Sequence, residues 1–170
     1  MGVGKTSLTY RYINNEFPPR YDDTIEDRII RQAKIDDKLY RIEILDIAGE
    51  DDYPQMLDVY KNFAEGFLLV FGINDRKSFD LVPSKRDHII KRKQTESCPM
   101  ILIGNKQDLT NNREVSYDEA KQLADSWNID YIETSAKTNF NCKEAFENLT
   151  VKIYESRPKI KRSLCPCYIY

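Results

Sequence analysis

The sequence predicts an α/β fold in which a doubly wound, mostly parallel sheet carries one antiparallel hairpin at its edge. Helical and strand-like segments alternate along the 170 residues, a length that suits one domain. Residues 66–73 and 100–103 are apolar on both faces, as strands are when helices cover the sheet above and below. Residues 28–35 and 40–46 flank a turn at 36–38, and we expect them to form the hairpin.

Helices are expected at residues 5–15, within the charged segment between 73 and 98, after Ser116 and from Cys142 onward. Pro83 marks the first turn of the second helix, because a proline deeper inside would cost about 3 kcal/mol. Ser116 and Glu119 form a capping-box pattern. The last two helices carry apolar stripes at Ala120, Leu123, Ala124 and Trp127, and at Cys142, Phe146, Leu149 and Ile153.

The charge and the composition argue against several classes of protein. The formal charge of −2 argues against a nucleic-acid-binding domain, which is usually strongly basic. No apolar run approaches the roughly 20 residues of a membrane-spanning helix, and Met1 leads into a glycine-rich turn rather than a secretory signal. We therefore expect a cytosolic chain in which Cys98 and Cys142 are buried small hydrophobes and His88 is a surface residue.

Ligands of doubly wound folds bind at the carboxyl ends of the strands, so the loops there should carry the chemistry. The first is Gly2-Val3-Gly4-Lys5-Thr6, which matches the end of the pattern G-x-x-x-x-G-K-[ST]. Its backbone N–H groups and Lys5 suit phosphate oxygens, and the Thr6 hydroxyl suits Mg²⁺. The alternative is a chance match, because the first glycine of the pattern would stand before Met1.

The second loop, Asp46-Ile47-Ala48-Gly49, directly follows the strand segment 41–45. An aspartate at a strand tip beside a phosphate loop can hold Mg²⁺ through water. Gly49 offers an unobstructed backbone N–H to a γ-phosphate. Taken alone, an aspartate at the end of a strand is more often a turn residue.

The third loop, Asn105-Lys106-Gln107-Asp108, follows the strand 100–104 and carries the most specific signal. The Asp108 carboxylate can accept hydrogen bonds from N1–H and the amino group of guanine, a pair that adenine does not supply. The Lys106 stem can lie over the base, and Asn105 can tie this loop to others. The alternative is a polar turn that closes a strand.

The fourth loop, Glu133-Thr134-Ser135-Ala136-Lys137, follows the short strand 131–132. Backbone N–H groups in this loop could meet the guanine carbonyl oxygen. Alone, this loop carries little information.

Together, in this order, the four loops resemble those of a Ras-family small GTPase from Gly2 to about Tyr154. The resemblance implies the G-domain fold of P-loop NTPases, binding of GTP and GDP with Mg²⁺, and slow GTP hydrolysis with Lys5 as a catalytic residue. It adds Ser7 and Phe17 as nucleotide-binding residues and Thr24 as a Mg²⁺ ligand when the γ-phosphate is present. The segment Tyr21–Asp27 resembles the first switch and implies effector proteins, besides exchange factors and GTPase-activating proteins.

Three departures from the family pattern stand out. The family's first strand would precede Met1, so we expect a sheet that lacks it and leaves its two neighbouring strands with open edges. Glu50 replaces the glutamine that orients the attacking water; it is the second candidate catalytic residue and leaves the rate of hydrolysis open. Asp23 stands where the family most often has proline, and residues 49–60 match the second switch.

The sequence divides into a Ras-like domain at residues 1–158 and a basic, cysteine-containing tail at 159–170. Cys167 lies four residues from the end, as in the C-a-a-X prenylation pattern, although tyrosine is an unusual last residue. Cys165 is a candidate palmitoylation site, and a second signal makes membrane binding stable. We expect a tail lipidated at the cytoplasmic face of the plasma membrane or another cell membrane; the alternative is an unmodified, disordered tail.

Two other functions compete with the GTPase switch. One is a non-enzymatic nucleotide-binding or scaffold module, favoured by Glu50 and by the incomplete phosphate loop. The other is an ATP-dependent P-loop kinase, which the guanine-specific role of Asp108 opposes.

Overall fold

A six-stranded sheet in the order β1-β2-β6-β3-β4-β5 forms the centre of the molecule. The computed structural model describes residues 2–19, 26–47, 63–95, 97–157 and 165–169. Its strands are β1 (Glu26–Ile35), β2 (Lys38–Ile47), β3 (Phe67–Gly72), β4 (Met100–Asn105), β5 (Asp130–Glu133) and β6 (Cys165–Ile169). The β1–β2 pair is antiparallel, and the other neighbouring strands run parallel. The predicted fold class is confirmed.

The β1–β2 hairpin turns on only two residues. Asp36 and Asp37 have positive φ values of 45° and 62°, and Ile35 pairs with Lys38. Such two-residue turns match the twist of the strands and need residues that tolerate left-handed backbone, as aspartate does. Lys38 therefore belongs to the strand and not, as expected, to the turn.

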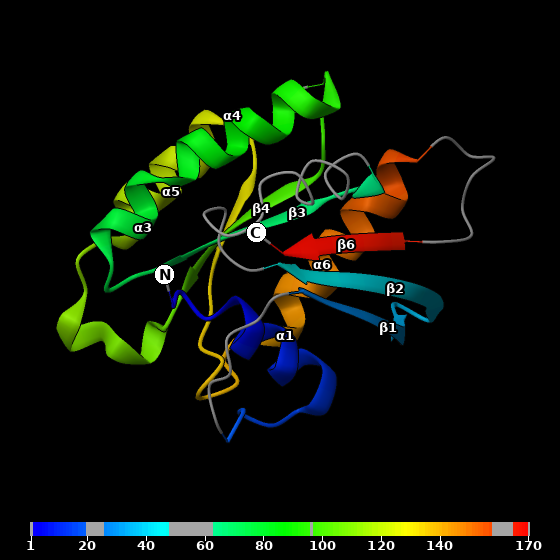
Figure 1. The fold of residues 1–170 in the computed structure, drawn as a ribbon, viewed down its shortest axis with the longest axis horizontal. Coiled ribbons are helices and arrows are strands. Elements are labelled where there is room, and N and C mark those ends of the chain that lie inside the picture. Colours follow the sequence, from blue (N-terminus) through cyan, green and yellow to red (C-terminus); the bar gives the residue numbers. More distant parts are fainter. Residues whose placement is uncertain (1, 20–25, 48–62, 96, 158–164, 170) are drawn as a thin grey trace.

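The helices cover both faces of the sheet (Figure 1). They are α1 (Lys5–Asn14), α3 (Arg76–Asp80), α4 (Val82–Lys93), α5 (Tyr117–Ser126) and α6 (Cys142–Ser156), with a 3₁₀ helix, η1, at Gln107–Asn112. Side chains alternate along β3: Leu68 and Val70 pack with α1 and α6, whereas Phe67, Leu69 and Phe71 pack with α3, α4 and α5. This alternation explains why the strand is apolar throughout.

The predicted helix signals are largely confirmed. The Ser116 hydroxyl caps α5 by accepting a hydrogen bond from the Glu119 N–H at 3.2 Å. The Glu119 carboxylate, expected to cap in return, instead pairs with Arg76 at 2.6 and 2.8 Å. Pro83 lies in the first turn of α4, and His88 is exposed on the same helix.

Both internal cysteines behave as small hydrophobes. Cys142 is buried at the start of α6 and Cys98 is half-buried before β4. Burial raises the pKa of each thiol to about 11. Their thiols therefore stay protonated and unreactive near neutral pH.

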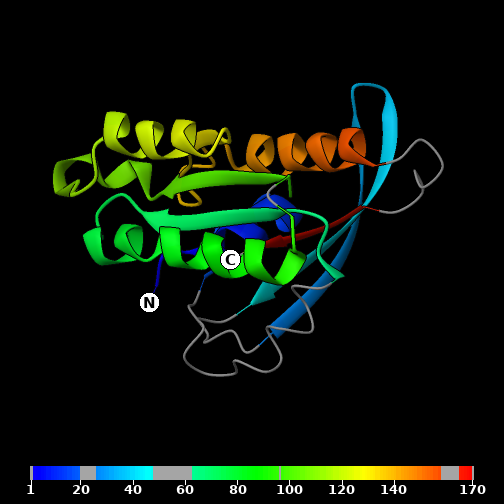
Figure 2. The same cartoon turned by 90° about the horizontal axis from the view of Figure 1, so that it is seen from above.

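Strand β6 occupies the centre of the sheet, between β2 and β3 (Figure 2). Its backbone pairs with residues 42–46 of β2 but only with Phe67 and Leu68 of β3. The expectation that both neighbouring strands have open edges is therefore wrong. Residues 165–169 were expected to belong to the tail, and Pro166 is a residue that central strands seldom contain.

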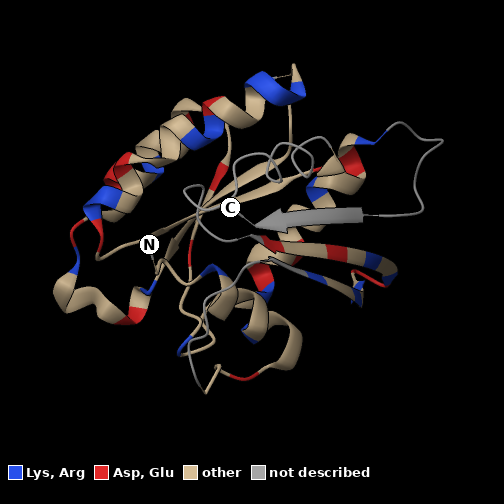
Figure 3. Cartoon of the chain, viewed as in Figure 1, with Lys and Arg blue, Asp and Glu red and all other residues tan. Residues whose placement is uncertain are grey.

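Charged residues of both signs are interspersed along the hairpin and the helices (Figure 3). The last turn of α4 is basic, with Lys91, Arg92 and Lys93 in succession. Within the described ranges, no helix combines the length and the apolar character needed to cross a membrane.

Candidate functional site

The glycine-rich turn leads directly into α1. Gly4 precedes the helix with a φ of +90°, and a Cβ there would lie 2.5 Å from Nδ2 of Asn105. Only glycine meets both conditions. No side chain caps the first turn of α1, and this turn contains no acidic residue. A helix start of this kind directs N–H groups and the positive end of the helix dipole toward an anion, as the predicted phosphate loop requires.

Asn105, at the end of β4, joins two of the predicted loops. Its side chain is 1% exposed, and Nδ2 donates to the carbonyl oxygens of Val3 at 2.9 Å and Gly4 at 3.4 Å. Its Oδ1 accepts from the Thr134 hydroxyl at 3.1 Å. Both Nδ2 and Oδ1 of Asn105 are therefore hydrogen-bonded. Asn105 connects the two loops, as the sequence predicted.

Asp108 is held by the loop after β5. The Ser135 hydroxyl donates to Asp108 Oδ1 at 2.6 Å and accepts from the Thr138 N–H at 3.1 Å. The Gln107 N–H donates to the Thr134 carbonyl at 3.0 Å. These bonds fix one oxygen of the carboxylate and thereby orient the whole group.

A cavity of about 230 Å³ lies where these loops meet α1. Leu109, which was not predicted from the sequence, is one of the residues that line it. The other eight are predicted nucleotide-binding residues: Gly4, Ser7, Phe17, Asn105, Lys106, Asp108, Ala136 and Lys137. Phe17 is 47% exposed and is therefore not a core phenylalanine. Its ring stands at the cavity, where a planar base could cover it.

The side chains that the sequence predicts as magnesium ligands lie at the carboxyl end of β2 and in the first turn of α1. Asp46 is 1% exposed near the end of β2, and Thr6 is the second residue of α1. Within the described ranges, no group of three or more His, Cys, Asp or Glu side chains could hold a metal by itself. One carboxylate and one hydroxyl fit Mg²⁺, which commonly takes its other ligands from water and substrate phosphates.

Several predicted site residues lie outside the residues that the structure describes. Thr24, Gly49 and Glu50 belong to ranges that the structure does not describe, as do residues 21–25 and 49–60 of the two switches. Cys165 and Cys167 are described only through the backbone pairing of β6. Gly2 and Val3 form the turn before Gly4, and Lys5 begins α1.

Two arginines hold the loop after β5, and the sequence analysis missed both. Arg113 donates from both Nη atoms to the two carboxylate oxygens of Glu133, at 2.7 and 2.9 Å. Glu133 also accepts from the Tyr131 hydroxyl at 2.9 Å, and burial, with the Glu133 charge, raises the pKa of Tyr131. Arg11 donates to two carbonyls of the loop. Neither contact has a sequence signal, because both join residues far apart in the chain.

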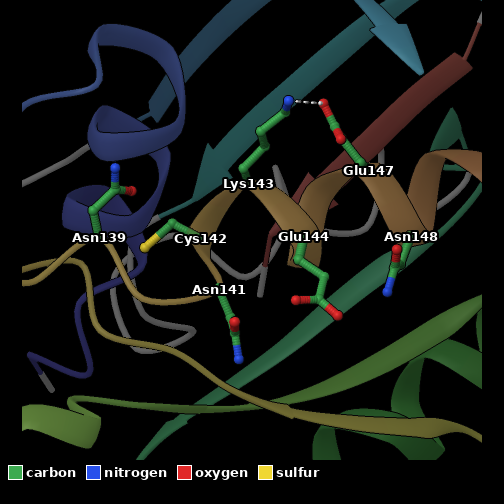
Figure 4. Close-up of a pocket in the computed structure, with 7 residues that line it drawn as sticks. All are labelled: Asn139, Asn141, Cys142, Lys143, Glu144, Glu147 and Asn148. Atoms are coloured by element: carbon green, nitrogen blue, oxygen red, sulfur yellow. Dashed lines mark ion pairs between the residues drawn. The ribbon is translucent and has the colours of Figure 1, made fainter. Parts of the chain in front are cut away.

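A second hollow, of about 340 Å³, lies at the start of α6 (Figure 4). It is lined by Asn139, Asn141, Cys142, Lys143, Glu144, Glu147 and Asn148, none of which belongs to the predicted nucleotide site. Its charged side chains include the Lys143–Glu147 pair, at 3.7 Å.

Comparison with known proteins agrees with this geometry. The Ras family model matches residues 1–155. "Ras-like protein RAS2" of Hydra vulgaris is 46% identical over 148 residues, covering 87% of this chain and 77% of the relative. "Ras-like protein rasB" of Dictyostelium discoideum is 41% identical over 162 residues, covering 95% and 82%. "Protein ras-1" of Neurospora crassa is 43% identical over 159 residues, covering 94% and 75%.

The family match extends over nearly the whole described domain and includes all four predicted loops. Nothing in these relatives or in the described residues favours the non-enzymatic alternative. The chain belongs to the Ras family of small GTPases, signalling switches that bind and hydrolyse GTP.

Proposed function

We propose that GDP and GTP bind in the 230 Å³ cavity with the base between Phe17 and Lys106 and with Asp108 accepting from N1–H and the amino group of guanine. The observation that carries this proposal is the double use of Asn105, which bonds the phosphate loop and the loop of Thr134 at once. One nucleotide can then meet both loops without rearranging either, which lowers the cost of binding.

The phosphates would lie over the turn Gly2–Gly4 and the start of α1, where backbone N–H groups and Lys5 meet them. Thr6 and Asp46 would hold Mg²⁺, directly and through water, and Thr24 would join when the γ-phosphate is present. The ion neutralises charge that develops on the phosphates during hydrolysis. Ser7, in the first turn of α1, completes this side of the cavity.

Hydrolysis would be slow because Glu50 replaces an amide. A carboxylate can accept a hydrogen bond from the attacking water, but it cannot donate one to the phosphate, and its charge repels the nucleotide. Gly49 would offer its N–H to the γ-phosphate. Lys5 would stabilise the charge on the β- and γ-phosphates throughout the reaction.

Single-turnover hydrolysis of GTP tests this function. Phosphate release by the wild type should exceed the uncatalysed rate, and Glu50→Gln should accelerate it severalfold by restoring a donor and removing a charge. Glu144→Gln, at an exposed position of α6, is the matched control and should leave the rate unchanged. Release no faster than without protein would contradict the proposal.

The switch would act on other proteins through residues 21–27, whose arrangement would depend on the γ-phosphate. Exchange factors would accelerate release of GDP, and GTPase-activating proteins would accelerate hydrolysis. Both classes act on the state of one nucleotide, so a cycle needs each of them.

Residues 165–169 pair within the sheet as β6, so lipidation of Cys167 would require this strand to leave the sheet. In that released state the tail would bind the cytoplasmic face of the plasma membrane or another cell membrane through lipid on Cys167, with Cys165 and the basic residues of 159–162 adding a second signal. Incorporation of a radiolabelled isoprenoid tests this step. Cys167→Ser should abolish labelling and move the protein to the soluble fraction, whereas Cys98→Ser should change neither. Labelling that persists in Cys167→Ser would contradict the assignment.

A further inference from the structure

Arg11 joins the last turn of α1 to the loop after β5. Its Nε donates to the Ala136 carbonyl at 2.7 Å, and Nη2 donates to the Lys137 carbonyl at 3.0 Å. Its Nη1 donates to the Asn15 carbonyl at 2.9 Å, at the C-cap of the same helix. One rigid guanidinium thus holds three backbone carbonyls, and a planar fork of donors is well suited to fixing several acceptors at once.

These bonds determine which way the loop directs its N–H groups. In a trans peptide the C=O and the following N–H point in opposite directions. Because Arg11 binds the carbonyl of Ala136, the N–H of Lys137 points away from Arg11. The carbonyl of Ser135 accepts from the Cys142 thiol at 3.2 Å and from the Phe140 N–H, so the N–H of Ala136 also points away from this anchored side.

Residues of both α1 and α6 contact the side of the loop on which its carbonyl groups are bonded. In Figure 4 the Cys142 sulfur points from the start of α6 toward α1, and Asn139 lies beside that helix. The Asn139 side chain donates to Asn15 Oδ1 at 2.9 Å. Ala136 and Lys137 also line the nucleotide cavity, together with Phe17, two residues after Asn15.

We propose that Arg11 is a positioning residue for base recognition: by holding the carbonyls of Ala136 and Lys137, it sets the N–H groups of this loop to receive the 6-oxo group of the purine. The inference rests on the proposed binding of guanine nucleotide. Two groups of residues would then recognise the base. The Asp108 carboxylate would accept hydrogen bonds from N1–H and the 2-amino group, and the loop N–H groups positioned by Arg11 would donate to the 6-oxo group.

Two nucleotide analogues separate these two groups of residues. Inosine diphosphate lacks only the 2-amino group and so probes the Asp108 side. 6-Thioguanosine diphosphate keeps N1–H and the amino group but replaces the 6-oxo oxygen with sulfur, a weaker hydrogen-bond acceptor. Competition against a fluorescent GDP gives two affinity ratios for each variant, GDP over the thio analogue and GDP over inosine diphosphate.

Arg11→Gln should lower the ratio of GDP to thio-analogue affinity about fivefold, the value of roughly one hydrogen bond, and leave the ratio of GDP to inosine diphosphate affinity unchanged. Arg11→Lys, which keeps the charge but not the fork, should fall between wild type and Gln. Arg31→Gln is the matched control, because Arg31 also contacts α1, at the Ile13 carbonyl and the Tyr12 ring, and should move neither ratio.

Hydrogen exchange gives a second readout that needs no nucleotide. The amides of Thr138 and Phe140, both bonded to Ser135, should exchange faster in Arg11→Gln than in the wild type or in Arg31→Gln. Unchanged exchange would overturn the inference.

The affinity ratios separate the remaining outcomes. If wild-type protein binds GDP selectively but both ratios are unchanged in Arg11→Gln, or fall equally, the inference is wrong and the proposed function stands. If the wild type does not bind GDP, both are wrong. If Arg11→Gln does not fold, Arg11→Lys decides by the same two ratios.

Discussion

The loops after β4 and β5 are bonded to each other, whereas the sheet between β2 and β3 depends on a strand from the other end of the chain. On the base side, Ser135 holds Asp108 and Thr134 holds Asn105, at 2.6 and 3.1 Å. On the phosphate side, β6 pairs with residues 42–46 of β2 but with only two residues of β3. Residues 69–72, the C-terminal part of β3, do not pair with β6.

The difference shows that one molecule can combine a region held by many hydrogen bonds with a region held by fewer. In the proposed function, base recognition needs fixed donors and acceptors, and the residues that would supply it are hydrogen-bonded to one another. The pairing between β6 and β3 is shorter, and segments with few backbone hydrogen bonds open at a lower free energy. Asn105 and Arg11 connect the loop after β5 to the phosphate turn and to α1, respectively.

Removal of residues 165–170 should have the largest effect. The free energy of unfolding should fall by on the order of 3 kcal/mol, because the ladder between β2 and β6 is lost. Amide exchange should accelerate at 42–46 and 67–68, whereas 101–104 in β4 should keep its protection. Replacing the basic residues of 159–162 with serine is the control. Equal loss of protection in β4 would contradict the division into two regions.

Asp108→Asn tests the base side directly. The variant loses the charge that strengthens two hydrogen bonds to guanine, so GDP affinity should fall about 100-fold. Asp125→Asn, at an exposed position on α5, should bind GDP as the wild type does. Fluorescent GDP titration measures both, and an unchanged affinity in Asp108→Asn would refute the assignment.

Asn105→Ala should uncouple the phosphate turn from the loop after β5. The Val3 carbonyl loses its donor and the Thr134 hydroxyl loses its acceptor, which should cost about 2 kcal/mol of stability and accelerate GDP release. The exposed Asn112→Ala is the control. Thermal unfolding and GDP dissociation measure the two effects. If GDP release stays at the wild-type rate, Asn105 does not couple the loops.

Gly4→Ala and Gly2→Ala form a matched pair in the phosphate turn. Both positions have positive φ, of 90° and 59°, so each alanine should cost about 1 kcal/mol. Only at Gly4 would the added Cβ also crowd Asn105, and that variant should lose about 1 kcal/mol more. Urea unfolding compares them. Equal losses would show that the close approach of Asn105 does not constrain the turn.

A separate effect is a dependence of stability on alkaline pH. Burial raises the pKa of Cys98 and Cys142 to about 11, above the value near 8.5 of an unfolded chain. The folded state then binds the thiol protons more tightly, so this contribution is present below about pH 8.5 and is lost as the pH rises toward 11. Urea unfolding at pH 8 and pH 10 should show a smaller decrease in Cys142→Ala than in the wild type.

The sequence located eight of the nine residues that line the 230 Å³ cavity. Apolar runs located β3 and β4; Asn105 is the last residue of β4, one position later than the expected end of the strand, and Asp108 follows it. The signals there are local: a strand, then a polar loop at its end. The capping residue Ser116 and the buried stripe of α6 were predicted for the same reason.

The rest depended on contacts between distant parts of the chain. Strand β6 contains Pro166 and only five residues, so its own pattern does not indicate a central strand. Arg11 lies on the same helix as several other polar residues, and its partner Ala136 is 125 positions away. Tertiary structure decides such pairings, and local sequence patterns carry no trace of them.

Competition between fluorescent GDP and ADP tests the central claim, that the bonded loops of Asn105, Asp108 and Ser135 form a guanine site. Guanine can donate both N1–H and its amino group to Asp108, and adenine offers neither. The account predicts that GDP binds at least about 1,000-fold more tightly than ADP, the equivalent of two or three charge-assisted hydrogen bonds. Equal affinity, or a preference for ADP, would contradict it.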